Sequence, residues 1–162
     1  FVAGIMEGLV QENHLAEIQT CFVGSEQIAL DVEKALGDLK SGEIIRGIRL
    51  VKKIMGDELP ADLANCHAMS DDLAAVKEWA SIFESPTHLV EVATKNWLFH
   101  KTAIKGDIAN EEQAWAAGNF FQAGEYTAEI ITALVGPIAS SPDTIAQSNS
   151  VLAIPNFLAD SI

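Results

Sequence analysis

The sequence predicts an all-α fold, a single-domain bundle of about six or seven amphipathic helices followed by an extended C-terminal tail. Apolar residues recur every three or four positions through most of the chain, and the alternating pattern typical of β-strands is absent. This periodicity stops at Pro137. With 162 residues the chain fits one domain with a sizeable core. We therefore divide it into a helical bundle domain, residues 1–138, and a tail or assembly arm, residues 139–162.

The first part of the chain is expected to contain four helices. Two short ones lie within residues 2–22 and are separated by the polar segment 11–14. Ser25 is a suitable N-cap for the third, and the fourth begins at Ser41 and ends at Gly56. Their predicted buried stripes are Ile5, Leu9, Leu15 and Ile18; Ile28, Val32, Ala35, Leu36 and Leu39; and Ile44, Ile45, Ile48, Val51 and Met55.

The second part is expected to contain the remaining helices. Heptad-like spacing predicts one helix over residues 61–84, and Ser85-Pro86 begins another that runs to Lys105. Gly106 is expected to end that helix, and a short acidic one and a final one to Gly136 follow. The predicted inward-facing residues are Cys66, Met69, Leu73, Val76, Ala80 and Phe83; Leu89, Val92, Asn96, Phe99 and Ala103; Ile108 and Trp115; and Phe120, Phe121, Gly124, Ala128, Ile131 and Leu134.

The charge of the chain restricts its partners. A net charge of −13 argues against nucleic acid and anionic lipid, and no apolar run is long enough for membrane insertion. All Lys and Arg residues lie between Lys34 and Lys105, so the C-terminal third is purely acidic. One helix face carries a basic row, namely Arg46, Arg49, Lys52 and Lys53. This row is either a solvated face or an electrostatic interface with the acidic end of a neighbouring copy.

The two cysteines, Cys21 and Cys66, bear on the compartment. Two thiols are common in cytosolic proteins, whereas in a secreted protein they form a bridge. The chain begins at Phe1, as expected after removal of a signal peptide. We therefore expect a Cys21–Cys66 disulfide and a secreted, extracellular or secretory-lumen location. In the chain-entropy model such a bridge contributes about 4 kcal/mol.

The sequence contains few candidates for catalysis or metal binding. It lacks the Glu-x-x-His pairs of metal sites in helical bundles, and His14 with Glu17 stands alone. No nucleophile elbow, phosphate loop or dinucleotide-binding glycine pattern is present. Cys66 beside His67 is better explained by a disulfide and a surface histidine than by an activated thiol. We therefore expect no catalytic residue, no metal site, no cofactor and no enzymatic activity.

Asn96 and His100 form a candidate buried polar pair. Their four-residue spacing stacks them on the predicted inner face beside Leu89 and Phe99. One interpretation is a hydrogen-bonded pair in the core. The other is a polar anchor inside a pocket for an apolar ligand.

Several motifs resemble those of small secreted or luminal all-helical proteins of protists such as ciliates. The residues that carry this resemblance are Cys21, Cys66, Lys95, Asn96, His100, Asp107, Ile108, Trp115, Gly118, Phe120 and Gly124. The similarity spans residues 1–138. It implies a fold and a compartment and no particular activity, and the tail lies outside it.

The tail carries the strongest functional signal. Its apolar residues should not stay in water, and they are Val151, Leu152, Ile154, Phe157 and Leu158. Pro155 keeps this segment from forming a continuous helix. The leading hypothesis is an extracellular structural subunit that self-assembles into a filament or other homo-polymer through a tail docked on a neighbouring copy. The alternative is a secreted carrier of a small apolar ligand with the tail as a lid, and a third class is a recognition module for another protein.

Overall fold

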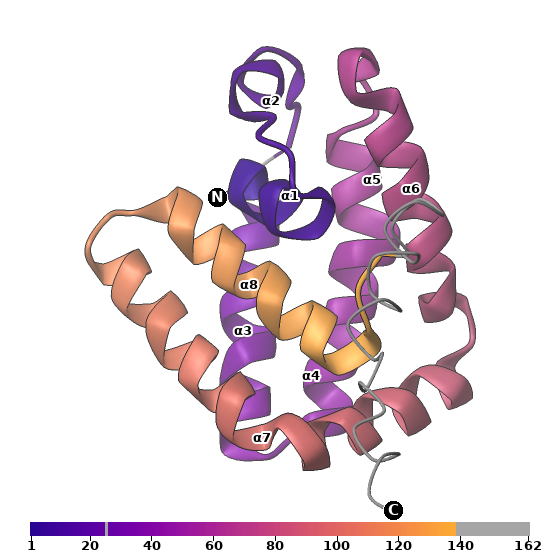
Figure 1. Cartoon of the computed structure of the whole chain (residues 1–162), viewed down its shortest axis with the longest axis vertical. Helices are drawn as coiled ribbons and strands as arrows, with labels where there is room; N and C mark the ends of the chain where they lie inside the picture. The colour runs from indigo at the N-terminus through magenta and orange to yellow at the C-terminus, as the bar shows by residue number, and fades with distance from the viewer. Residues whose placement is uncertain (25, 139–162) are drawn as a thin grey trace, which may run out of the picture.

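The structure is a computed structural model that describes residues 1–24 and 26–138, and it is all-α, as the sequence predicts (Figure 1). The predicted N-cap Ser25 and the tail lie outside the described residues. A π-helical turn, Ile54–Glu58, joins α4 to α5, and 3-10 turns, His67–Met69 and Ser81–Glu84, flank α6. The α-helices are α1 (Val2–Val10), α2 (Leu15–Cys21), α3 (Gln27–Ser41), α4 (Ile44–Lys53), α5 (Leu59–Asp62), α6 (Ser70–Ala80), α7 (Pro86–Ala116) and α8 (Phe120–Val135).

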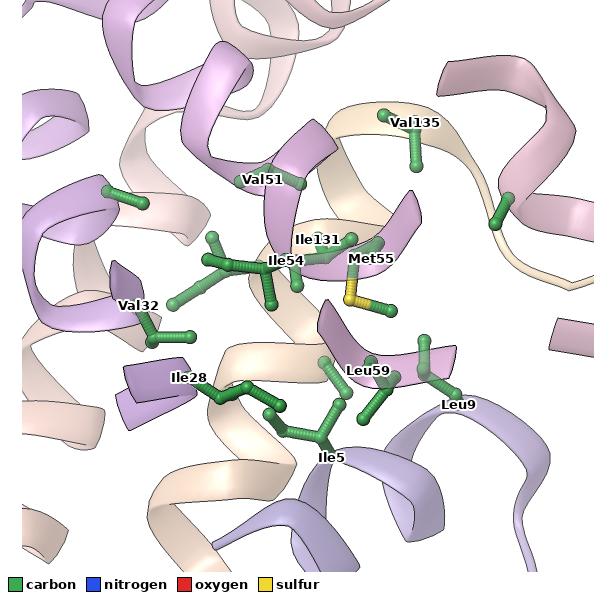
Figure 2. Packing of buried hydrophobic residues seen from close by; sticks show 14 of the residues in the cluster. Ile5, Leu9, Ile28, Val32, Val51, Ile54, Met55, Leu59, Ile131 and Val135 are labelled. Carbon is green, nitrogen blue, oxygen red and sulfur yellow. The ribbon is translucent and has the colours of Figure 1, made fainter. Parts of the chain in front are cut away.

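Helix α8 occupies the centre of the arrangement. It packs along α7 and against α1, and in Figure 1 it crosses in front of α3 and α4, with α1 and α2 above it. The buried apolar residues of the described helices form one cluster. Figure 2 shows side chains from α1, α3, α4, the π-helical turn, α5 and α8 meeting there: Ile5, Leu9, Ile28, Val32, Val51, Ile54, Met55, Leu59, Ile131 and Val135.

The helical path that begins with α4 does not stop at Gly56, contrary to the prediction. The chain continues through the π-helical turn into α5. Ile54, Met55 and Leu59 are all buried, so the extra residue per turn keeps the apolar side chains on the core while exposed Gly56 faces outward. Burial outweighs the weak helical propensity of glycine here. Ile45 is exposed and does not belong to the buried face.

The prediction of a single helix over residues 61–84 is wrong as well. The chain turns between α5 and α6, and Cys66 at this turn is bonded to Cys21 of α2. The tertiary bond therefore overrides the helical spacing. The burial pattern nevertheless agrees with the prediction at Cys66, Met69, Val76, Ala80 and Phe83.

Helix α7 runs unbroken through Gly106, where the sequence predicts its end. In Figure 1 it follows the lower edge of the molecule and then turns upward before the link to α8. Its buried face also differs from the predicted one, since Phe99 is 75% exposed. The side chains that it buries are Leu89, Ala93, Trp97, Ile104, Ile108, Glu111 and Ala114. Packing at both ends of the helix exceeds the cost of about 1 kcal/mol for an interior glycine.

Candidate functional site

An apolar groove of about 780 Å³ is the candidate functional site. It lies where α1, α2 and the start of α3 meet the end of α7 and the start of α8. We call it the apolar groove. Its lining residues are Phe1, Val2, Ala3, Leu15, Ile18, Gln19, Phe22, Gly24, Glu26, Ile28, Ala29, Leu30, Glu33, Trp115 and Phe120.

Large apolar side chains of the apolar groove remain open to solvent. The exposed fractions are 40% for Leu15, 56% for Leu30, 39% for Trp115 and 48% for Phe120. The Trp115 ring meets Phe1 and Phe120 edge to face, with centroids 5.3 and 4.9 Å away. An aromatic row beside exposed aliphatic side chains is typical of a surface that binds an apolar partner.

Helix α2, which forms one wall of the apolar groove, is fastened at both ends. At its C-terminal end Cys21 forms the predicted disulfide with Cys66, with the Cα atoms 5.0 Å apart. At its N-terminal end the Nε2 atom of His14 lies 2.5 Å from Oδ2 of Asp72 in α6. Both attachments are to the segment that contains the turn after α5 and the start of α6. They hold the wall in place independently of whatever occupies the apolar groove.

The rim of the apolar groove is acidic. Glu26 and Glu33 are exposed there, and none of the described lining residues is Lys or Arg. An anionic ligand would meet like charge in this position. The apolar groove therefore favours a neutral or cationic partner.

A smaller hollow of about 280 Å³ adjoins the apolar groove and shares Glu33 and Trp115 with it. Glu111 lines this hollow and is only 6% exposed. Burial raises the pKa of its carboxyl group to about 7, and the charges of Glu112 and Glu33 add to this effect. The hollow thus carries an acid that titrates near neutral pH beside the apolar groove.

The basic row of α4 is partly used within the chain. It consists of Arg46, Arg49, Lys52 and Lys53. Nζ of Lys53 lies 2.6 Å from the Asp31 carboxylate and 2.8 Å from the Glu58 carboxylate. Arg46 lies 3.8 Å from Asp38. None of the four lines the apolar groove.

Asn96 and His100 do not form the predicted buried pair. Nδ2 of Asn96 donates to the carbonyl of Leu134 over 2.8 Å, whereas His100 is exposed. Trp79 makes a similar contact, because its Nε1 donates to the carbonyl of Gly136 over 2.9 Å. These two bonds fix the end of α8. Asn96 and His100 are separated because the face that α7 buries differs from the predicted stripe.

The predicted assembly residues of the tail lie outside the described residues, and they are Val151, Leu152, Ile154, Phe157 and Leu158. The apolar groove itself was not predicted. Leu15, Trp115 and Phe120 each belong to an apolar stripe of their own helix, so the sequence predicts that they are buried. The sequence feature that could have indicated the apolar groove is Leu30, which is apolar but lies off the buried stripe of α3.

The apolar groove has the chemistry of a binding surface. Its polar side chains are an amide, Gln19, and the two rim carboxylates. A separate grouping of Glu12, His14 and Asp72, near the start of α2, has the donor types of a metal site. None of the described lining residues is a histidine, serine, threonine or cysteine.

The chain is thus an all-helical domain with an exposed apolar groove. The sequence matches no known protein family, and no curated protein or solved structure is significantly similar to it. The resemblance to protist proteins stays a prediction. Among the described helices, none is long and apolar enough to cross a membrane.

Proposed function

We propose that this protein is a non-enzymatic extracellular structural subunit that self-assembles by docking the apolar segment of its tail into the apolar groove of a neighbouring copy. The observation that carries the proposal is the exposure of Leu30 and Phe120 beside Trp115 in a groove of about 780 Å³. Such side chains are costly to leave in water. A partner that covers them gains the corresponding free energy.

The tail segment suits the apolar groove in chemistry. Residues 144–159 contain no charged side chain, so the acidic rim at Glu26 and Glu33 does not repel them. The five apolar side chains between Val151 and Leu158 contribute about 1.5 to 3 kcal/mol each when buried, before ordering costs are subtracted. A fatty acid would bring a carboxylate to the same acidic rim, which disfavours it.

The spacer of the tail is long enough for the apolar segment to reach an apolar groove on its own copy or on an adjacent one. Helix α8 has 16 residues and is about 24 Å long, and it separates the Phe120 end at the apolar groove from the last described residue, Ile138. When extended, residues 139–150 span up to about 40 Å. A tail on one copy and a groove on the next make a heterologous contact, which closes a ring or continues as a filament.

The charges and the disulfide support this function. Arg46 and Arg49 are exposed on α4, while the chain after Gly106 contains only acidic charges, so two copies can align opposite faces. A Cys21–Cys66 disulfide persists in oxidising compartments, which fits secretion.

The oligomeric state of the full chain tests the proposal. Light scattering coupled to size exclusion should show assembly that increases with protein concentration. Leu30→Glu, in the apolar groove, should give monomers. Phe99→Glu, which changes an exposed apolar residue outside the apolar groove, should assemble like the wild type. A wild-type chain that stays monomeric at millimolar concentration would rule out assembly.

The volume of the apolar groove favours one alternative, the carrier of a small apolar ligand. About 780 Å³ lies within the usual range for small-molecule sites, roughly 300 to 1,000 Å³. In this alternative the tail of the same copy acts as a lid. Organic extraction of the natively purified protein, followed by mass analysis, distinguishes the two. A stoichiometric apolar compound in a monomeric protein would support the carrier.

A further inference from the structure

Three potential metal ligands converge beside α2, although they are distant in sequence. Glu12 and His14 belong to the link between α1 and α2, and Asp72 belongs to the first turn of α6. One donor atom from each lies within 4.8 Å of the other two. Sequence spacing pairs His14 with Glu17, so only the fold reveals this grouping.

The grouping combines a buried imidazole with carboxylates that are open to solvent. His14 is only 6% exposed, Asp72 is half-buried and Glu12 is exposed. Within the described residues, Asp72 forms an ion pair with His14, and neither Glu12 nor Asp72 forms one with Lys or Arg. Two carboxylates therefore share a single imidazole, which leaves local negative charge for a cation to neutralise.

We propose that Glu12, His14 and Asp72 bind a divalent transition-metal ion, with Zn²⁺ as the best match. One nitrogen and two carboxylate oxygens are ligands that Zn²⁺ accepts, and a fourth position stays open for water on the exposed Glu12 side. Ca²⁺ is a poorer match, because it takes six to eight oxygen ligands. Mg²⁺ likewise prefers oxygen ligands in an octahedral arrangement.

Metal binding would replace the contact between His14 and Asp72. The two side chains lie within hydrogen-bond distance, with Nε2 and Oδ2 2.5 Å apart. To coordinate the ion, Nε2 must carry a lone pair, so a proton on this atom moves to Nδ1 or leaves to solvent. Each side chain then bonds the ion instead of the other.

The bound ion would strengthen one wall of the apolar groove. Leu15, which lines the apolar groove, directly follows His14, and the disulfide at Cys21 already holds the other end of α2. The ion would tie the start of α2 to α6 and the loop residue Glu12. Metal binding is thus expected to order the acceptor wall, while the metal site itself does not depend on the proposed self-assembly.

Calorimetry and thermal melts with the full chain, first stripped with EDTA, test the proposal. Titration with ZnCl₂ should show one ion per chain and raise the Tm, and MgCl₂ should have little effect. Since His14 is buried, His14→Ala can lose stability for other reasons. Glu12→Gln avoids this problem because Glu12 is exposed: it should weaken Zn²⁺ affinity at least about tenfold and leave the Tm in EDTA unchanged.

The matched control is His100→Ala, which removes an exposed histidine outside the grouping and should bind Zn²⁺ like the wild type. No heat and no Tm change at millimolar Zn²⁺ would overturn the proposal. So would an affinity that Glu12→Gln does not lower, or one that His100→Ala lowers equally. Both variants should keep the oligomeric state measured for the wild type in EDTA, so this result is separate from the test of self-assembly.

Discussion

Gly124 of α8 lies directly against the backbone of α1 at Gly4. A Cβ atom on Gly124 would lie 3.0 Å from the carbonyl carbon of Gly4 and 2.7 Å from the amide nitrogen of Ile5. On Gly4 it would lie 2.8 Å from the carbonyl carbon of Phe121. Because backbone atoms cannot rotate away, the two backbones can come this close only where a side chain is missing. This crossing brings Phe1 beside the start of α8, and so forms one end of the apolar groove.

Gly124→Ala should destabilise the protein by about 2 to 3 kcal/mol, because the added methyl group meets backbone atoms in a close-packed contact. Urea denaturation followed by circular dichroism measures this loss. Gly106→Ala is the control, since nothing lies within 4 Å of its added Cβ inside α7. It should stabilise by about 0.5 to 1 kcal/mol. Equal effects at the two glycines would contradict the close crossing.

Removing the disulfide should lower stability and loosen α2. The double variant Cys21→Ser, Cys66→Ser opens a loop with a sequence separation of 45 residues. The expected loss is about 4 kcal/mol in the chain-entropy model. Amide hydrogen exchange in α2 should become faster than in the wild type, and more so than in α8. The reason is that the Cys21 end of α2 loses its covalent attachment, while the His14 end keeps its contact with Asp72. Unchanged exchange in α2 would mean that its packing alone holds the wall.

Glu111 should make stability depend on pH. Burial raises the pKa of its carboxyl group from the ordinary value of 4.5 to about 7, so between these pH values the folded state binds more protons than the unfolded state. Stability therefore falls as the pH rises through this window. At pH 8, Glu111→Gln should be about 2 kcal/mol more stable than the wild type, and the difference should vanish near pH 4.

Urea titrations at several pH values give the Glu111 difference. Glu91→Gln is the matched control, because Glu91 is exposed on the same helix, α7, and is not among the charges that raise the pKa of Glu111. It should change stability little across the same range. A stability difference for Glu111→Gln that is the same at pH 4 and pH 8 would show that the carboxyl group keeps an ordinary pKa.

Lys53→Met should destabilise more than Lys52→Met, although the two residues are neighbours on α4. Lys53 is hydrogen-bonded to Asp31, which lowers the pKa of that buried carboxyl group, and it also contacts Glu58. Since the folded pKa of Asp31 is depressed, its stabilising contribution is present at neutral pH and is lost as the pH falls below about 4. The urea midpoints of the two variants should therefore converge in acid.

Much of the core could be predicted from the sequence. The stripe of α3, which includes Ile28, Val32 and Leu39, is buried as expected, because an amphipathic helix beside a core presents one apolar face to it. The break between α1 and α2 and the end of the last helix before Pro137 also agree. The pairing of Cys21 with Cys66 could be predicted because the sequence contains no other cysteine.

The apolar groove and the grouping of Glu12, His14 and Asp72 could not be predicted in the same way. Periodicity identifies an apolar face but not whether a neighbour covers it, so Phe120 was assigned to the core although it is half exposed. On α7, Trp97 is buried and Phe99 is 75% exposed, and the apolar character of the two residues does not show which of them faces the core. His14 and Asp72 meet across 58 residues, a separation at which local patterns carry no information.

Mixing two defective chains tests the central claim most directly. Leu30→Glu blocks the apolar groove but keeps the tail, and Phe157→Glu blocks the tail but keeps the apolar groove. Each chain alone should sediment as a monomer. An equimolar mixture should form a one-to-one dimer and nothing larger in analytical ultracentrifugation, because one tail and one groove remain functional. A mixture that contains only monomers would contradict docking between copies.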